Sequence, residues 1–283
     1  MTRPTEPAVR RTVRRSAAIS GKTLLTGEPV TVSLHPAESG SGIIFRHGPT
    51  GTDTPAMLDH VADVPQCTSL QAEGVGIDFV EHLLAALAAG GITDVLVEVD
   101  GGEVPLLDGS AAPYEALVRE AEPQPLTEAL EPIRLQESVK IEGEGKVIIA
   151  LPGEPAFWYL LDHEHPLIGR QAAIYRPLRD DFGTQVAPAR TFTTEAEARA
   201  LIAARGIEGA DEGMAIVAYA DRLSAPEPLT NSFAMHKVID MLGDLYLLGR
   251  PLHATVIAYR TGHADNRALA RAIQSAIIGT EDV

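Results

Sequence analysis

The sequence predicts an α+β fold made of two halves of similar content. Helical and strand patterns are mixed in each half, without the regular strand–helix–strand alternation of a doubly wound parallel sheet. The order of elements starts again after a Pro- and acid-rich stretch near the middle of the chain, although no sequence repeat can be found. With 283 residues, of which 45% are hydrophobic, the chain is long enough to bury a core without disulfides.

Four strands and two helices are expected in the first half. Gly-bearing segments such as GKTLLTGE predict turns between the strands. The helix that carries EHLLAAL ends at two glycines, which are typical of helix C-termini. Residues 48–76 are rich in Gly, Pro, Asp and Thr and are expected to form loops with at most one small hairpin. The expected strands span residues 12–20, 29–37, 42–47 and 92–100, and the expected helices residues 79–91 and 114–121.

A domain boundary is expected at EPQPLTEALEP, which contains three prolines and several acidic residues. In the second half, the expected strands span residues 137–143, 146–152, 157–166, 214–220 and 253–262, and the expected helices residues 194–206, 231–248 and 264–277. We therefore predict a disordered leader at residues 1–11, an N-terminal α+β domain at residues 12–127 and a C-terminal α+β domain at residues 128–283.

Composition excludes several classes of function. The formal net charge of −16 argues against binding to nucleic acid or to an anionic membrane surface. The single cysteine excludes an internal disulfide framework and fits a reducing compartment. The basic N-terminus lacks the apolar run of a secretory signal, and no stretch has the length of a transmembrane segment. These features predict a cytoplasmic protein, and they leave its oligomeric state open.

The segment FAMHKVIDMLGDLYLLG places polar residues along one face of an otherwise apolar helix. His236, Asp240 and Asp244 follow one another at intervals of four, so their side chains project from nearly the same face. His236 and Asp240 can hold one metal ion, and a catalytic zinc site needs a third protein ligand. His82, in the helix of the first half, can supply it, and the adjacent Glu81 can take a proton from a metal-activated water.

Each of these residues also has a structural alternative. Glu81 lies three residues after Asp78 and can complete a capping arrangement at the start of its helix. His82 can be a buried histidine with ordinary hydrogen bonds. His236 and Asp240 can form an i,i+4 ion pair worth roughly 0.3–0.5 kcal/mol.

Three further histidines are candidates for the same site. His263 follows a glycine at the start of the last helix, where it can protonate a leaving amine if a carboxylate such as Asp244 keeps it charged. A capping or surface role is the alternative for His263. His163 and His165, in DHEHP, can compete as metal ligands, and sequence alone does not decide between them.

Five motifs in the same order resemble one known family. VEHLLAAL, EVPLLDGSAAPY, PARTF, HKVIDMLGDLYLLG and AYRTGHADN are similar to segments of the zinc-dependent UDP-3-O-acyl-N-acetylglucosamine deacetylases of lipid A synthesis, the LpxC family. The similarity extends from about Thr12 to Ala276. The resemblance implies two α+β domains with the active site at their interface, and a small UDP-amino-sugar substrate that carries an acyl chain.

The resemblance also implies a role for each candidate residue. The zinc ligands would be His82, His236 and Asp240, a set that also permits Fe²⁺. Glu81 would be the general base, and His263, oriented by Asp244, the cationic acid. Thr191 in PARTF would contact the oxyanion, Phe192 would lie beside the substrate, and Lys237 would lie near its phosphates.

Several segments depart from the family pattern near the expected substrate. Leu25 occupies the position of a family histidine, Phe79 that of a threonine, and LTNSFAMHK lacks an acidic pair before HK. The segment RGIEGADEGMAIV has Ala210, Asp211 and Glu212 where the family has Gly-Gly-Ser. Two alternatives therefore accompany the main prediction: a zinc deacetylase of a different N-acetylated sugar or sugar nucleotide, and a catalytically silent paralogue that binds zinc or a ligand.

Overall fold

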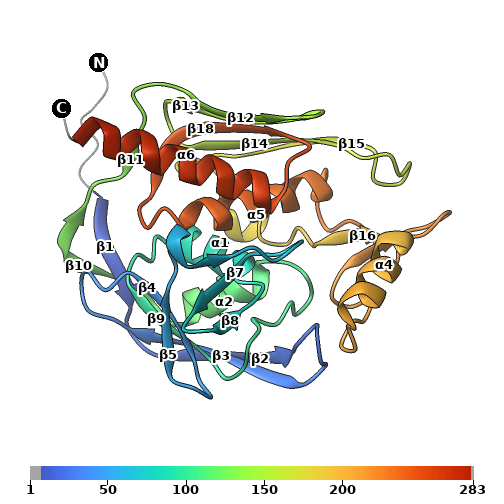
Figure 1. The fold of residues 1–283 in the computed structure, drawn as a ribbon, viewed down its shortest axis with the longest axis horizontal. Helices are drawn as coiled ribbons and strands as arrows, with labels where there is room; N and C mark the ends of the chain where they lie inside the picture. The colour runs from blue at the N-terminus through green and yellow to red at the C-terminus, as the bar shows by residue number, and fades with distance from the viewer. Residues whose placement is uncertain (1–7, 282–283) are drawn as a thin grey trace.

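A computed structural model describes residues 8–281 and confirms the α+β class. Two sheets enclose helices between them, so the layers run sheet, helices, helices, sheet (Figure 1). The strand order of the first sheet is β2-β3-β9-β4-β5. Its strands are β2 (Ala17–Lys22), β3 (Pro29–Pro36), β4 (Ile43–His47), β5 (Thr52–Pro55) and β9 (Val95–Val99).

The second sheet repeats this topology. Its order is β12-β13-β18-β14-β15, with β11 pairing alongside β18. In both sheets the last strand lies between the second and the third, antiparallel to the former and parallel to the latter. The strands are β11 (Ile133–Arg134), β12 (Val139–Gly143), β13 (Lys146–Pro152), β14 (Ala156–Asp162), β15 (Arg170–Tyr175) and β18 (Leu252–Tyr259).

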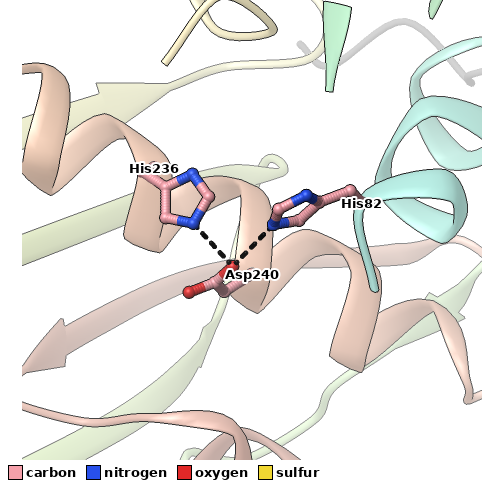
Figure 2. Close-up of side chains that lie close together, drawn as sticks. All are labelled: His82, His236 and Asp240. Carbon is pink, nitrogen blue, oxygen red and sulfur yellow. Dashed lines mark ion pairs between the residues drawn. The ribbon is translucent and has the colours of Figure 1, made fainter. Parts of the chain in front are cut away.

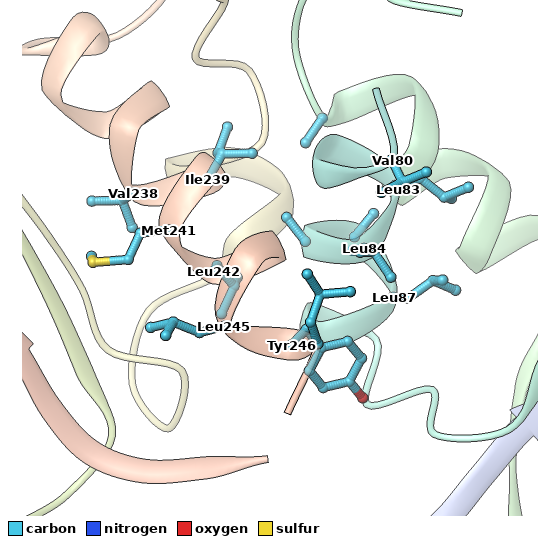
Figure 3. Close-up of a cluster of buried hydrophobic side chains, with 14 of the residues drawn as sticks. Val80, Leu83, Leu84, Leu87, Val238, Ile239, Met241, Leu242, Leu245 and Tyr246 are labelled. Carbon is cyan, nitrogen blue, oxygen red and sulfur yellow. The ribbon is translucent and has the colours of Figure 1, made fainter. Parts of the chain in front are cut away.

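Two helices, one from each half, meet at the centre of the molecule. α1 (Glu81–Ala89) precedes β9, just as α5 (Ser232–Tyr246) precedes β18. Apolar side chains of both helices pack into one core, including Leu84 of α1 and Leu242 of α5 (Figure 3). α2 (Ala112–Glu120) and α6 (His263–Glu281) follow the corresponding last strands. The polar residues of α1 and α5 are therefore brought together at a helix–helix contact within the core.

Smaller elements surround one side of this contact. β6 (Val61–Ala62), β7 (Ser69–Ala72) and β8 (Val75–Ile77) form a three-stranded sheet after a single 3₁₀ turn (Leu58–His60). The parallel pair of β16 (Phe192–Thr194) and β17 (Ile216–Ala218) carries α4 (Glu195–Arg205), which projects to the right in Figure 1. A capping box between Thr194 and Glu197 begins α4. One further short helix, α3 (Phe182–Gln185), precedes this insert.

Three expectations about the ends of the first half differ from the structure. Residues 12–20 are not one strand, because β1 (Ala8–Val13) ends before β2 begins. β1 also includes residues 8–11 of the expected leader, while residues 1–7 lie outside the described part of the chain. The expected domain boundary at residues 122–132 contains a strand, β10 (Pro123–Leu130), which is antiparallel to β1. A two-stranded ribbon tolerates the prolines because it has no further strand to bond their missing N–H groups.

Candidate active site

Three predicted ligands lie together at the contact between α1 and α5. His82 projects from α1, and His236 and Asp240 project from α5, each with one ligand atom within 4.8 Å of the others (Figure 2). Asp240 Oδ1 lies 3.6 Å from His82 Nε2 and 3.3 Å from His236 Nε2. All three residues are buried. Two imidazole nitrogens and one carboxylate oxygen are the donors of a catalytic zinc site.

The surroundings of these residues favour a metal over an ion pair. His236 donates its Nδ1–H to the Ala189 carbonyl at 3.1 Å, which directs Nε2 toward Asp240. Burial lowers the pKa of His236 to about 3, so this ring is neutral at physiological pH, as a ligand must be. Burial acts to raise the pKa of Asp240, but the Lys237 ammonium, the largest opposing influence, holds it well below its usual value. The residues present therefore fit a divalent metal.

Glu81 lies at the first position of α1, next to His82. Val80 precedes it as N-cap without a side-chain hydrogen bond, so Glu81 does not complete a cap with Asp78. Instead, Glu81 Oε2 accepts the backbone N–H of Thr68 at 3.0 Å. Burial raises the pKa of Glu81, which brings this carboxyl closer to the range of a general base.

Gly243 allows the two helices to approach closely at this point. A Cβ on Gly243 would overlap the backbone carbonyl oxygen of Glu81. The glycine in the motif HKVIDMLGDLYLLG thus has a packing reason, since any larger residue would push α1 away from α5. It sets the distance between the helix that carries Glu81 and the helix that carries Asp240 and Asp244.

His263 faces Glu81 from the first position of α6. Its Nδ1 donates to Asp244 Oδ2 at 2.9 Å, and its Nε2 lies 3.9 Å from Glu81 Oε1. Burial acts to lower the pKa of His263, but the nearby charges of Asp244 and Asp240 raise it to about 9. A protonated imidazole therefore points toward Glu81 and the three candidate ligands.

Thr191 and Phe192 border the same space. Gly109 of DGSAAP, at a φ of +80°, permits Thr191 to pack directly against this loop, and the Thr191 N–H donates to the Gly109 carbonyl at 2.7 Å. Arg190 of PARTF donates to the carbonyls of Asp108 and Gly213, both at 2.6 Å. The DGSAAP loop and the PARTF segment thus together hold Thr191 at the edge of the site.

Lys237 differs from the expectation in one respect. Its Nζ donates to Asp240 Oδ2 at 2.8 Å, so in this structure it bonds to a candidate ligand as well as lining the cavity. It also lies over the Phe192 ring, 5.6 Å from the centroid.

One cavity of about 1020 Å³ is lined by the three candidate ligands and by Glu81, His263, Thr191, Phe192 and Lys237. His163 lines it, 6.4 Å from the Phe192 ring, but belongs to no metal cluster among the described residues. His165 is neither among the lining residues nor in the cluster; it receives the Leu167 N–H on Nδ1 at 3.3 Å. One end of the cavity has an apolar wall from the first half and from the insert, formed by Leu24, Phe79, Leu106, Leu201, Ile207 and Met214.

Asp211 and Glu212 also line the cavity, but they are not part of the apolar cluster that forms this wall. Asp211 Oδ1 accepts the Gly213 N–H at 2.6 Å, Glu212 accepts the Tyr219 hydroxyl, and both residues are exposed. Phe79 and Leu25, which also depart from the family pattern, pack into the apolar cluster around Leu24. The departures therefore add apolar side chains to the wall and two exposed carboxylates to the cavity lining.

Sequence reasoning did not identify the buried residues that hydrogen-bond to Asp244. The Thr68 hydroxyl donates to Asp244 Oδ1, and Asn266 Nδ2 donates to Asp244 Oδ2 at 2.9 Å. Thr68 lies in a segment expected to be loop, and nothing in its pattern marks it. Asn266 lies within AYRTGHADN, but only His263 of this motif was predicted to have a role.

The fold and the site define a class: two α+β halves of equal topology with a candidate His₂Asp metal centre between them. The sequence model for the family described as UDP-3-O-acyl N-acetylglycosamine deacetylase, LpxC, matches residues 10–275. Three proteins named UDP-3-O-acyl-N-acetylglucosamine deacetylase are similar over most of their length. The Leptospira biflexa protein is 34% identical over 96% of this chain and 92% of its own. The Anaeromyxobacter dehalogenans protein is 36% identical over 93% of this chain and 86% of its own length. The Solibacter usitatus protein is 37% identical over 91% of this chain and 88% of its own length.

The chain belongs to this deacetylase family. Its class is therefore that of hydrolytic amidases, as the five motifs predicted. None of the helices among the described residues is long and apolar enough to cross a membrane.

Proposed function

We propose that this chain hydrolyses the N-acetyl amide of UDP-3-O-acyl-N-acetylglucosamine in lipid A biosynthesis. The observation that carries the proposal is the convergence of Glu81, His263 and the candidate metal ligands on one cavity with an apolar end. A silent paralogue is a poor match, because the acid, the base and the three ligands are all present and face one another. We also propose that the chain forms two α+β domains and that the boundary between them lies within β10, near residue 127.

Each residue of the site would have a separate role in the reaction. Zinc held by His82, His236 and Asp240 would act as a Lewis acid toward the amide carbonyl and lower the pKa of the attacking water, and Fe²⁺ suits the same ligands. Glu81 accepts the proton of that water as its oxygen adds to the carbonyl carbon. His263 donates the Nε2 proton to the amine nitrogen as the C–N bond breaks and acetate leaves. Asp244 orients His263 and favours its charged form.

Negative charge develops on the carbonyl oxygen as water adds. Thr191 and protonated His263 border the space where that oxygen would lie, so they can stabilise it without reorganisation. Donors placed in this way commonly account for a large share of such rate accelerations.

Substrate recognition would use both ends of the cavity. The apolar wall around Leu24 and Leu201 can bury an acyl chain, at about 25 cal/mol per Å² of apolar surface removed from water. Phe192 would lie beside the sugar, and Lys237 is a cation within reach of substrate phosphates. Asp211 and Glu212 also line the cavity, but both are exposed and accept hydrogen bonds from the Gly213 N–H and the Tyr219 hydroxyl, so the apolar wall can still hold an acyl chain.

Acetate release from two substrates tests the proposal. Zinc-loaded protein would be given UDP-3-O-(3-hydroxyacyl)-N-acetylglucosamine and, in parallel, UDP-N-acetylglucosamine without the acyl chain. We expect turnover of the first and a much lower kcat/KM for the second. Equal kcat/KM for the two would contradict the role of the apolar wall and favour a different N-acetylated sugar, and no turnover of either would contradict the proposed activity.

A further inference from the structure

Thr68 is buried behind the site, where it bonds directly to Glu81 and also to Asp244, the residue that orients His263. It lies between Cys67 and the start of β7 and is fully buried. Its backbone N–H donates to Glu81 Oε2 at 3.0 Å, and its carbonyl accepts the N–H of Val80 at 3.2 Å. The backbone of Thr68 is thus fixed to the first turn of α1, at the residue that carries the base.

The side chain of Thr68 reaches in the other direction, to α5. Its hydroxyl donates to Asp244 Oδ1, while the other oxygen of Asp244 accepts from His263 Nδ1 and from Asn266 Nδ2, both at 2.9 Å. Asp244 therefore receives three donors that together fix the plane of its carboxylate. The plane of that carboxylate in turn sets the direction in which His263 points its Nε2.

Arg267 fixes the direction of the Thr68 hydroxyl. Its Nη1 donates to the Cys67 carbonyl at 3.2 Å and to Thr68 Oγ1 at 3.3 Å. A guanidinium can only donate, so Oγ1 accepts from Arg267 and its own proton is left for Asp244. The hydrogen bonds therefore converge on Asp244: Arg267 donates to Thr68, the Thr68 hydroxyl donates to Asp244 Oδ1, and His263 donates to Asp244 Oδ2.

We propose that Thr68 is a positioning residue that sets Glu81 and His263 relative to each other, through its N–H on one side and its hydroxyl on the other. The proposal rests on the proposed function for the roles of Glu81 and His263. The two groups come from different halves of the chain, and their facing atoms are 3.9 Å apart. Thr68 is the residue that bonds both to Glu81 and to Asp244, which supports His263, although it touches neither substrate nor the candidate ligands.

Removing the hydroxyl alone tests this role. Thr68→Val keeps the backbone N–H and nearly the same volume, and Thr68→Ser keeps both donors. We expect Thr68→Val to lower kcat about 10- to 100-fold with little change in KM, as is typical of residues that orient an active-site group, and Thr68→Ser to restore most of the rate. If Thr68→Val does not fold, Thr68→Ala also lacks the hydroxyl and takes its place.

A double-mutant cycle separates positioning from a general packing effect. If Thr68 acts through Asp244 on His263, Thr68→Val should cost little further in a His263→Gln background. Equal losses in both backgrounds, or a loss that Thr68→Ser does not restore, would overturn the proposal.

A readout without turnover keeps this test apart from the proposed function. The His263 Nδ1 proton, bonded to Asp244, should give a downfield NMR resonance that is absent from His263→Gln. We expect Thr68→Val to shift or broaden this resonance and Thr68→Ser to leave it in place; an unchanged resonance in Thr68→Val would overturn the proposal. A wild-type protein that releases no acetate contradicts the proposed function, and the resonance then still decides the role of Thr68.

Discussion

Asp240 shows how the site handles the cost of burying charge. A carboxylate removed from water is unfavourable unless it is paired or coordinates a cation. Here Lys237 bonds one oxygen, while the other faces the Nε2 atoms of His82 and His236. Because His236 is neutral, its ring places no full positive charge beside this second oxygen. A divalent cation at this position would complete the electrostatic balance, which explains why such residues lie inside a core.

Replacement of single ligands should remove the metal. We expect Asp240→Ala and His82→Ala to lose stoichiometric zinc, because three protein ligands are the usual minimum for a catalytic zinc site. The measurement is metal content after dialysis, by mass spectrometry. His163→Ala is the matched control, since His163 lines the same cavity but lies outside the three-residue cluster. Loss of zinc in the control, or its retention in both ligand variants, would contradict this assignment.

The pH dependence of turnover should identify His263. Its protonated form is the proposed acid, so kcat/KM should fall as pH rises through its pKa. Burial lowers this pKa and Asp244 is the largest influence that raises it, so Asp244→Asn should move the basic limb to lower pH. Asp265→Asn is the control, because Asp265 also lies in the first turn of α6 but bonds Lys146 and the Gly262 N–H instead. A basic limb that is the same in Asp244→Asn and wild type would be inconsistent with this role.

At the scale of elements, the contact between α1 and α5 determines the site. α5 packs on β14 and β15 of its own half, α1 packs on α5 and α2, and the apolar faces of α1 and α5 share one core (Figure 3). The candidate ligands come from both helices, so any change in the helix separation changes the metal geometry. A shift of less than 1 Å matters for a metal site, where ligand distances tolerate only about 0.2 Å.

Gly243→Ala should separate these helices. The added Cβ would overlap the Glu81 carbonyl, and the backbone cannot rotate away as a side chain could. We expect a loss of about 1–3 kcal/mol in the free energy of unfolding, the usual cost of overpacking, together with weaker zinc binding. Gly76→Ala is the control, since its Cβ would meet only ordinary contacts at 3.8 Å or more. Thermal melts and zinc titrations compare the two variants, and equal behaviour would refute the packing argument.

The sequence predicted the helices more accurately than the strands at the edges of the sheets. α5 and α4 were predicted to within a few residues, because periodicity and capping residues are local signals. β15, which pairs with the nearby β14, was missed because its short polar–apolar pattern gave no clear strand signal. β10 was missed because it contains prolines and because pairing with β1, far away in the chain, decides its structure. Thr68 could not be found for the same reason: its partners, Glu81 and Asp244, are 13 and 176 residues away.

At the scale of the whole molecule, topology reveals a duplication that the sequence does not. The two sheets have the same strand order, and the last strand is inserted in the same way in each. α1 and α5 occupy equivalent places in the two halves, and each contributes a histidine to the candidate metal centre. The pattern explains why five motifs spread over the chain converge at one place.

The shared core predicts that the two halves unfold together. α1 and α5 bury apolar residues against each other, and the Tyr246 hydroxyl bonds the Ile92 carbonyl of the other half at 2.8 Å. In metal-free protein, we expect denaturation followed by fluorescence of Trp158, the single tryptophan, to coincide with that followed by far-UV circular dichroism. Trp158 lies in β14 and reports on the second half alone. Separate transitions would show that the halves are independent.

The most direct test of the account is the turnover of UDP-3-O-(3-hydroxyacyl)-N-acetylglucosamine by Glu81→Gln at full zinc occupancy. The amide keeps the size of the side chain but cannot accept the proton from water. The account predicts that this variant binds one zinc, as the wild type does, and that kcat falls by about 10²- to 10⁴-fold, the usual contribution of a general base. Wild-type turnover in Glu81→Gln with its zinc in place would contradict the assignment of Glu81 and, with it, the proposed mechanism.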